Sequence, residues 1–397
     1  MAQTDWPMRD KTAVVGVGFG VFGRASGLTQ MQQNQVAFHN ALLDSGLQPS
    51  DIDGVLVHSG PTQCDQLPEY LGLNVRWSGQ VWPHGRMAAV ALQDAAMVVN
   101  SGMANAVAVF SSNVNRKMIT GERNEHDESY RPGGGPHAEY PPYGMVHPGC
   151  LAAMSFGRYV DKYGGDPDNL GYVAVNQRYN ASLNPNAVYR TPITIEDYKE
   201  ARKIIEPLRL FDFTVNTDGA VCLIVTRADR ARDCKNVPVL ISGMQGLASG
   251  SEFATLSMMG GGASRQSDYR YSVNEYPQYT QTGYEMAGLS SAKDIQAFNM
   301  YDSFSPMALF TIEEWGICEP GEGLSFLGST DTTVKGTVPI NTGGGHLSAG
   351  MMSGANVVAE AIQQARGDCG DRQVKDCTYS QYVHTAFLTT IFKNGNK

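Results

Sequence analysis

Apolar residues in the first part of the chain fall into short continuous runs and into helix-spaced stripes. The seven residues from Thr12 to Gly18 are almost all apolar or glycine, which is typical of a buried strand. Apolar positions at helical spacing follow between Gln30 and Asp44, and Gly46 marks the end of that helix. Three further elements are predicted downstream: a strand over 54–58, a helix over 88–100 and a strand over 106–110. This alternation of strands and helices predicts a layered α/β fold.

The same order of elements begins again near residue 238. In the first copy a Gly-Leu turn leads through Ile52 to a strand that ends at His58. In the second copy a Gly-Leu turn leads through Ile295 to a strand that ends at Tyr301, again six residues after the isoleucine. A duplicated α/β unit explains this repeat, and His58 and Tyr301 are then its matching strand ends. We divide the chain into two halves, residues 1–235 and 236–397.

The first half contains a long region that fits neither a strand nor a helix pattern. From residue 116 to about 149 the sequence is polar and rich in Gly, Pro, His and Tyr, and a segment of this length without periodicity is usually a functional loop. Helical spacing returns over 151–163, and the following residues are again mixed. We therefore predict an inserted loop region over about 116–210. His137 and His147 stand ten residues apart, a spacing that fits no common metal-ligand pattern, so no metal site is predicted.

Composition and charge narrow the class of protein. Hydrophobic residues make up 42% of the 397 residues and charged residues 17%, as in an ordinary globular protein. The formal net charge of −9 argues against a nucleic-acid partner, since phosphate binding needs a basic face. No apolar run approaches the roughly 18 residues of a membrane span, and the N-terminus lacks the pattern of a signal peptide. Seven cysteines without regular spacing fit a reducing compartment, so we expect a cytoplasmic protein without membrane contact.

Five motifs, spread in order over most of the chain, give it a family resemblance. They are Gly16-Val17-Gly18, Arg178 to Pro185, Thr217 to Ala220, Tyr301 to Phe304 and Asn341 to Ser348. With these motifs the chain resembles the thiolase superfamily, and within it the sterol-carrier-protein-type, thiolase-like branch. The resemblance implies an α/β thiolase fold, a duplicated five-layered αβαβα arrangement with mixed sheets. It also implies a homodimer and a pocket for an acyl-CoA, in which the CoA thioester is part of the substrate and no separate cofactor is bound.

The catalytic positions of thiolases carry over only in part. In thiolases the nucleophilic cysteine stands at the start of the long helix of the first half, about 17 residues before the glycine that ends this helix. In this chain, counting back from Gly102 leads to Gly85. The motif that begins with a histidine in thiolases begins here with Tyr301, and Met351 stands where the Gly–His–Pro motif has its histidine. The final Cys–x–Gly loop corresponds to 383–387, which has no cysteine. Covalent acyl transfer needs an activated nucleophile, which glycine cannot supply, so ordinary thiolysis or Claisen condensation is not expected.

One subgroup of this branch is similar in the same departures. Steroid side-chain aldolases, which cleave a β-hydroxyacyl-CoA in the retro-aldol direction, also lack the cysteine and carry tyrosine at the position of Tyr301. The resemblance implies a carbon–carbon lyase of lipid metabolism and steroid degradation, which releases a ketone and a short acyl-CoA. These aldolases work with a small OB-fold, zinc-ribbon protein, so a heterotetramer with such a partner is also implied. Their second tyrosine lies about 50 residues after the first, where this chain has Met351.

A retro-aldol step needs a base for the β-hydroxyl proton, a site for the enolate oxygen and an acid that returns a proton to carbon. We place Tyr301 and His346 at this site. Histidine, with an ordinary pKa of about 6.5, suits the role of base, and tyrosine, at about 10, that of hydrogen-bond donor or acid, although the reverse assignment stays open. Backbone amides or space are expected from Gly344, Gly345 and Gly85. Substrate contacts are expected from Asp302, Met351 and His84.

Other functions remain open from the sequence. A catalytically silent thiolase-like subunit that supports a partner enzyme would also lack the cysteine and both usual histidines. A Claisen-type acyltransferase or thiolase with a displaced nucleophile would need another thiol, for which Cys150, after Pro148-Gly149, is the candidate. A third alternative is non-covalent binding of acyl-CoA or lipid without turnover.

Overall fold

The centre of the protein is a mixed β-sheet. The computed structural model describes residues 6–59, 63–82, 85–114, 141–145, 147–214, 216–247, 277–385 and 388–397. In these residues the strands of the sheet follow one another in space as β3 (Trp77–Gln80), β2 (Gly54–Ser59), β4 (Ala106–Asn113), β7 (Gly219–Arg227), β1 (Thr12–Phe19), β8 (Val239–Gln245), β11 (Leu388–Asn394), β10 (Tyr379–His384) and β9 (Ala297–Met300). A separate small sheet pairs β5 (Lys203–Ile205) with β6 (Leu208–Arg209).

Apart from the edge strand β3, the strand order is symmetric about the central pair β1 and β8. The first strands of the two halves, β1 and β8, lie side by side and pair antiparallel at Ala13↔Leu240 and Val14↔Val239. Outward from this pair come the last strands of each half, β7 and β11, then β4 and β10, and then β2 and β9. The inner pairs are antiparallel, whereas β2 with β4 and β9 with β10 are parallel. A duplicated unit with mixed strands produces this order, as predicted; the boundary at residue 235 stays a prediction.

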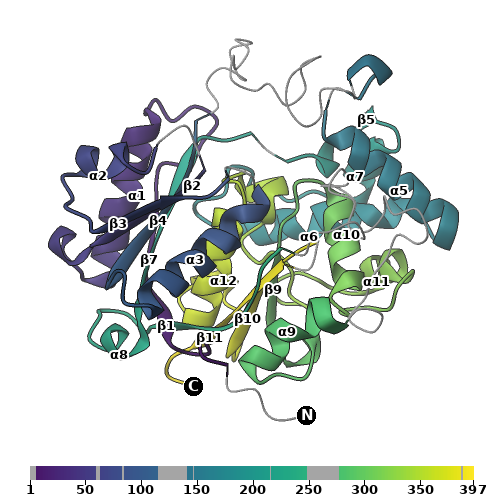
Figure 1. Ribbon diagram of the computed structural model, residues 1–397. Coiled ribbons are helices and arrows are strands. Elements are labelled where there is room, and N and C mark those ends of the chain that lie inside the picture. The colour runs from purple at the N-terminus through teal and green to yellow at the C-terminus, as the bar shows by residue number, and fades with distance from the viewer. Residues whose placement is uncertain are drawn as a thin grey trace.

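Helices divide the molecule into five layers (Figure 1). Two central helices, α3 (Ala88–Asn100) and α12 (Ala355–Arg366), lie between the two halves of the sheet. Helix α1 (Gln30–Ser45) covers the outer face of the first half, and α9 (Pro277–Ala287) that of the second. The buried residues follow the same division, because Val14 belongs to the core around the central helices while Ala13 and Val15 belong to the core under α1. The predicted αβαβα arrangement is therefore confirmed.

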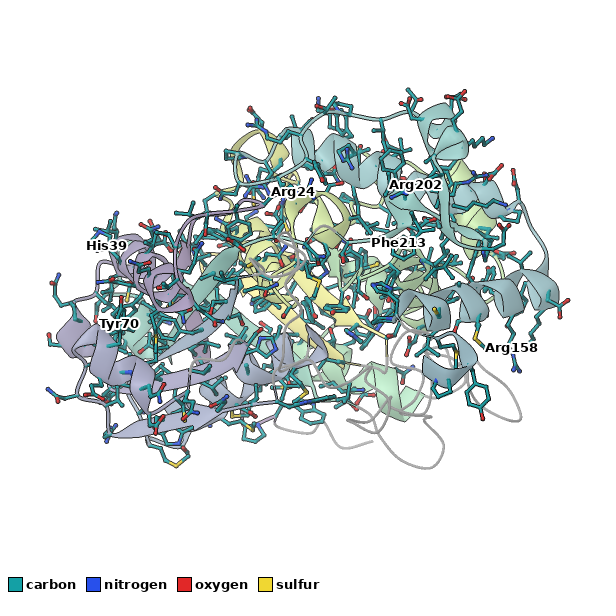
Figure 2. All side chains as sticks on the ribbon, turned by 90° about the horizontal axis from the view of Figure 1, so that it is seen from above. Arg24, His39, Tyr70, Arg158, Arg202 and Phe213 are labelled. Atoms are coloured by element: carbon teal, nitrogen blue, oxygen red, sulfur yellow. The ribbon has the colours of Figure 1, made fainter. Side chains whose placement is uncertain are left out.

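The region predicted as a loop insertion contains several helices in its described part. The remaining helices are α2 (Gln66–Leu71), α5 (Gly149–Tyr163), α6 (Gly171–Ser182), α7 (Ile195–Glu200), α8 (Ala228–Ala231), α10 (Ser305–Glu314) and α11 (Gly323–Ser329). Three of these, α5 to α7, fall within 116–210. Helix α5 confirms the helical spacing predicted over 151–163, whereas α6 and α7 were not predicted. Figure 2 shows α1 and α2, with His39 and Tyr70, on one side of the molecule and α5, with Arg158, on the opposite side. Residues 115–140 lie outside the described part.

One edge of the sheet collects the strand ends and helix starts that form the site. Parallel pairing brings the carboxyl ends of β9 and β10 to the same edge, and Tyr301 follows directly after β9. The two central helices begin beside one another at this edge, since a Cβ added to Gly354, just before α12, would lie 2.8 Å from the carbonyl oxygen of Gly85. Among the described residues, no helix is long and apolar enough to cross a membrane.

Candidate active site

Gly85 and the phenol of Tyr301 occupy one space. Gly85 opens the short helix η2 (Gly85–Met87), which leads directly into α3. An ideal Cβ on Gly85 would stand 2.1 Å from the hydroxyl oxygen of Tyr301 and 2.5 Å from its Cε2 and Cζ. Tyr301, which is only 4% exposed, therefore fills the volume in which a side chain at residue 85 would begin. The nearest atoms to that missing side chain belong to a phenol and not to a thiol.

Tyr301 lies between two buried imidazole rings. The ring centroid of His346 is 4.8 Å from that of Tyr301, with the planes at 69°. The ring centroid of His384 is also 4.8 Å away, with the planes at 36°. The parallel register Met300↔Val383 explains the second contact, because it sets His384, the last residue of β10, beside Tyr301. The family motif indicated only a missing cysteine in 383–387, and no pattern in the sequence indicated His384.

Asp302 holds the polypeptide around His346. The carboxylate is fully buried and accepts the backbone N–H of His346 at 2.9 and 3.1 Å, one distance to each oxygen. Nδ1 of His346 lies 3.1 Å from Oδ1 of the same carboxylate. Nε2 of His346 accepts the backbone N–H of Gly354 at 3.2 Å. Because Nε2 is an acceptor, a neutral His346 carries its proton on Nδ1, which lies near the carboxylate but makes no hydrogen bond of good geometry to it.

The glycine-rich turn before His346 is packed too tightly for larger residues. Gly344 has φ +97°, and a Cβ there would lie 2.5 Å from Cβ of Ala181 on α6. Gly345 has φ +58°, and a Cβ there would lie 2.3 Å from Oδ2 of Asp302. Both glycines therefore allow a close approach as well as a left-handed backbone. The turn continues into η10 (Gly345–Ala349), one turn of π-helix that carries His346.

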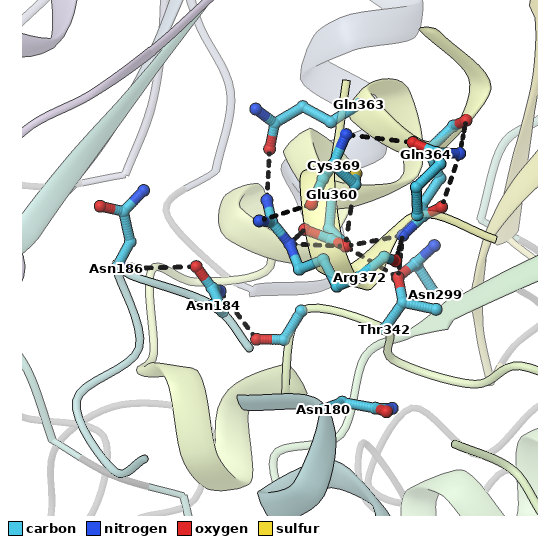
Figure 3. A network of polar contacts seen from close by, with 12 residues as sticks. Asn180, Asn184, Asn186, Asn299, Thr342, Glu360, Gln363, Gln364, Cys369 and Arg372 are labelled. Atoms are coloured by element: carbon cyan, nitrogen blue, oxygen red, sulfur yellow. Dashed lines mark hydrogen bonds and ion pairs between the residues drawn. The ribbon is translucent and has the colours of Figure 1, made fainter. Parts of the chain in front are cut away.

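A buried polar network supports this turn from its other side (Figure 3). Glu360 of α12 accepts hydrogen bonds from Oγ1 of Thr342 at 2.8 Å and from Nε of Arg372 at 3.1 and 3.2 Å. Asn184 donates to the carbonyl oxygen of Gly343 at 2.8 Å. The turn is thus bonded to the helix on one side and to the segment after α6 on the other, which restricts its movement.

The second tyrosine of the related aldolases is replaced here by Met351, and another tyrosine, Tyr382, lies near the start of α12. Met351 is half-buried, and its backbone N–H donates to Oγ1 of Thr217 at 2.9 Å. Tyr382, on β10, is fully buried, and its hydroxyl oxygen lies 3.2 Å from the position of a Cβ on Gly354. Burial raises the pKa of the Tyr382 phenol well above its usual range, and the charges of Tyr301 and Asp302 raise it further. A tyrosine therefore does approach the start of α12, but it comes from a strand that the motif comparison did not consider.

His84, His58 and Cys150 are the remaining candidates from the sequence. His84 lies outside the described residues. His58, the repeat counterpart of Tyr301, is fully buried at the end of β2, with Nδ1 2.7 Å from Oγ of Ser111. Cys150 is the second residue of α5, and the ring of His147 packs against those of Phe213 and Phe304. In the part of the chain that the structure describes, no three His, Cys, Asp or Glu side chains form a group that could hold a metal ion.

Comparison with known proteins shows the family to which the chain belongs. The family model described as thiolase C-terminal domain-like matches residues 260–388. The 17-hydroxy-3-oxo-4-pregnene-20-carboxyl-CoA lyase of Mycobacterium tuberculosis is 33% identical, over 90% of this chain and 92% of the relative. The steroid side-chain-cleaving aldolase of Thermomonospora curvata is 32% identical, over 89% of this chain and 90% of the relative.

A solved structure extends the comparison to three dimensions. The Ltp2–ChsH2(DUF35) aldolase has a chain that superimposes with a TM-score of 0.86 at 30% identity, over 98% of this chain and 99% of that one. This agreement over nearly the full length of both chains shows that they have the same fold. The chain therefore belongs to the family of steroid side-chain-cleaving aldolases, carbon–carbon lyases built on the thiolase fold.

Proposed function

We propose that the protein cleaves a β-hydroxyacyl-CoA with a steroid-like acyl group by a retro-aldol reaction. The products are a ketone and a short acyl-CoA, and no covalent acyl-enzyme is formed. The observation that carries the proposal is the Tyr301 hydroxyl beside Gly85, because by the family resemblance Gly85 corresponds to the nucleophile of thiolases. The names of the two relatives, a carboxyl-CoA lyase and a side-chain-cleaving aldolase, support the same substrate class.

The proposed chemistry needs proton transfer and stabilisation of negative charge. Tyr301 takes the β-hydroxyl proton, the bond between Cα and Cβ breaks, and its electron pair moves to the thioester as an enolate. The start of α3, reached through Gly85, offers backbone N–H groups and the positive end of a helix dipole to the enolate oxygen. Protonation at Cα then gives the acyl-CoA, so the reaction is redox-neutral and uses CoA only as part of the substrate.

Asp302 and His346 hold this arrangement in place. The ring of His346 is fixed between the Asp302 carboxylate and the backbone N–H of Gly354, just before α12. Its edge-on contact with Tyr301 limits where the phenol can turn. We assign the proton transfer to Tyr301 and the orienting role to His346, which is the second of the two assignments that the sequence left open.

We further propose two protein partners. Like the Ltp2–ChsH2(DUF35) aldolase, whose name joins two proteins, the chain would act with a small partner, an OB-fold, zinc-ribbon protein in a heterotetramer. A second copy of the chain would pair along β3, which has β2 on one side and no other described strand on the other. Trp82, just beyond β3, is 49% exposed and would be covered in such a dimer.

The test is cleavage of a tertiary β-hydroxyacyl-CoA by the purified protein, alone and with the candidate partner. Ketone and acyl-CoA, measured by mass spectrometry, should appear with the wild type. The Tyr301→Phe, His346→Ala double variant should lose at least about a hundredfold in kcat/KM. Ketone release that persists undiminished in the double variant would refute the site, and no release by the wild type with its partner would refute the reaction.

A further inference from the structure

Tyrosine alone is a weak base at neutral pH, and this sets a requirement on its neighbours. The following inference rests on the proposed retro-aldol function. A phenol with an ordinary pKa of about 10 holds its proton at pH 7, so Tyr301 can take a proton from the substrate only if another group accepts its own. That group must lie against the phenol and must have a lone pair to receive a proton.

His346 does not meet this requirement. Its Nε2 already accepts the backbone N–H of Gly354 at 3.2 Å, and its Nδ1 faces the Asp302 carboxylate at 3.1 Å. A proton on Nε2 would oppose the N–H of Gly354 and remove a hydrogen bond in a fully buried place. His346 is therefore suited to holding the turn and the start of α12 in position.

His384 does meet it. The ring lies 4.8 Å from that of Tyr301, at 36°, and the residue is only 2% exposed. Nδ1 contacts the carbonyl oxygen of Thr385, and because a carbonyl oxygen only accepts, the neutral ring carries its proton on Nδ1. This tautomer keeps the lone pair on Nε2. The backbone of His384 is fixed by the indole N–H of Trp315, which donates to its carbonyl oxygen at 3.2 Å.

Comparison of the two repeated halves shows that the fold does not require a histidine at the position of His384. In the first half His58 is the last residue but one of β2, and its Nδ1 lies 2.7 Å from Oγ of Ser111 on the neighbouring strand β4. In the second half Tyr301 follows β9 and lies beside His384 on the neighbouring strand β10. Ser111 and His384 thus hold matching places. A serine satisfies the place in the half without the reactive tyrosine, and the histidine appears where Tyr301 is.

We propose that His384 is the proton acceptor of Tyr301. The phenol proton of Tyr301 passes to Nε2 of His384, which leaves a phenolate and an imidazolium in contact. The phenolate takes the β-hydroxyl proton as the bond between Cα and Cβ breaks, the ketone leaves, and the electron pair becomes the thioester enolate. The proton held on His384 then returns through Tyr301 to Cα, so that the enzyme ends the cycle unchanged.

The surroundings favour a proton moving within this pair. Titratable neighbours include Asp302, on the segment after β9, His346, on η10, and Tyr382, beside His384 on β10. The Tyr382 phenol stays protonated, since burial raises its pKa well above its usual range. His384 is argued to act through Tyr301, and we therefore test it with measurements that a purely structural residue would leave unchanged.

The experiment compares His384→Asn with Tyr301→Phe, His346→Gln and the surface control His39→Gln in the full-length protein with its partner. His384→Asn should lower kcat/KM about a hundredfold while acyl-CoA product binding stays within about twofold. In the wild type the fall of kcat/KM at acidic pH reports protonation of His384, so this limb should vanish in His384→Asn and remain in His346→Gln. His39 lies exposed on α1 (Figure 2), and its variant should match the wild type.

A second measurement does not depend on turnover. The tyrosinate absorbance of Tyr301, taken as the difference between the wild type and Tyr301→Phe, should appear at higher pH when His384 is asparagine. His384→Gln replaces His384→Asn if the latter does not fold. An unchanged acidic limb together with an unchanged Tyr301 titration would overturn the inference. A wild type that cleaves no substrate but shows the Tyr301 shift would overturn the proposed reaction and leave the His384–Tyr301 pair standing.

Discussion

The Cβ that Gly85 lacks would stand 2.1 Å from the hydroxyl oxygen of Tyr301. Two non-bonded heavy atoms cannot approach so closely, so a side chain at residue 85 and the present position of Tyr301 exclude each other. A cysteine in this place would require the tyrosine to move or to be replaced. The absence of a side chain at residue 85 and the position of the Tyr301 phenol are therefore structurally coupled.

This relationship predicts a large effect from one methyl group. Gly85→Ala should displace the Tyr301 ring from its place between the two imidazoles and lower kcat/KM at least about a hundredfold, because a shift of about 1 Å can cost that much. Turnover of the proposed substrate and the unfolding midpoint should both be measured. Gly157→Ala is the matched control, since a Cβ at Gly157 on α5 meets nothing within 4 Å. Normal turnover in Gly85→Ala would show that Tyr301 need not lie where it does.

Asp302→Asn should lower both the stability of the protein and its turnover. The buried carboxylate accepts the backbone N–H groups of His346, at 2.9 Å, and Leu347, at 3.4 Å. An amide accepts through one oxygen only and turns a donor toward Nδ1 of His346, so we expect a loss of about 2–3 kcal/mol in unfolding free energy and of at least a hundredfold in kcat.

Asp53→Asn is the control for that variant. Asp53 also accepts two backbone N–H groups, from Asn105 at 2.7 Å and Ala106 at 2.9 Å, but lies at the far end of β2 from His58. Urea unfolding should show a loss of stability in both variants, and turnover should fall only in Asp302→Asn. Equal losses of turnover per folded molecule would mean that general destabilisation explains the effect.

Local patterns in the sequence were sufficient for the sheet and its central helices. The apolar run and small-residue stripe predicted α3 at 88–100, as observed, and β1 to within one residue. Helix α6 gave no such pattern, because Gln177, Arg178 and Asn180 are all buried polar residues. Arg178 donates to Oγ of Ser348 at 3.0 Å, and Asn180 donates to the carbonyl oxygen of Ile340 at 3.0 Å. A helix surrounded by protein on several sides has no solvent-facing stripe to reveal it.

His384 was not predicted from the sequence, for a different reason. Its relation to Tyr301 depends on the parallel register of β9 with β10, and 83 residues separate the two residues along the chain. No local spacing encodes such a contact. The family motif has a cysteine in this segment and gives no expectation for the histidine that this chain has there. The repeat did offer one signal, since matching Tyr301 with His58 also matches their neighbouring strands.

Asp212 should make stability depend on pH. This carboxyl is fully buried between α7 and α10, and burial raises its pKa to about 6, although the N–H of Arg209 and the hydroxyl of Tyr198 oppose the shift. The folded state therefore binds a proton more tightly than the unfolded state, whose Asp pKa is near 3.8. Protonation of Asp212 therefore adds to the free energy of unfolding below about pH 4, and this contribution is lost as the pH rises to about 6.

Asp212→Asn removes this titration and so provides the measurement. The difference in unfolding free energy between wild type and variant should change by on the order of 3 kcal/mol between pH 4 and 7, with the wild type losing stability relative to the variant as pH rises. Denaturant unfolding at several pH values gives the difference directly. A difference that does not vary with pH would show that the carboxyl titrates normally in the folded protein.

Arg372→Met should destabilise the protein far more than the loss of an exposed ion pair. Glu360 and Arg372 are 6% and 8% exposed, and their bond lies in the network behind the glycine-rich turn (Figure 3). Methionine fills the space of the arginine stem but leaves the buried Glu360 carboxylate without its cation, which costs about 3–5 kcal/mol. Glu360→Gln combined with Arg372→Met should recover part of this loss, since no charge is then left buried.

The exposed pair Arg227–Asp229, with side chains 58% and 65% exposed, is the comparison for this experiment. Arg227→Ala should leave the unfolding midpoint unchanged because solvent and salt screen such pairs. Because Thr342 also donates to Glu360, a carboxylate freed from Arg372 should pull on the turn that carries His346, so turnover should fall together with stability. If Arg372→Met lowers stability but leaves turnover per folded molecule intact, the network supports the fold alone and the turn is held by Asn184 and Asp302.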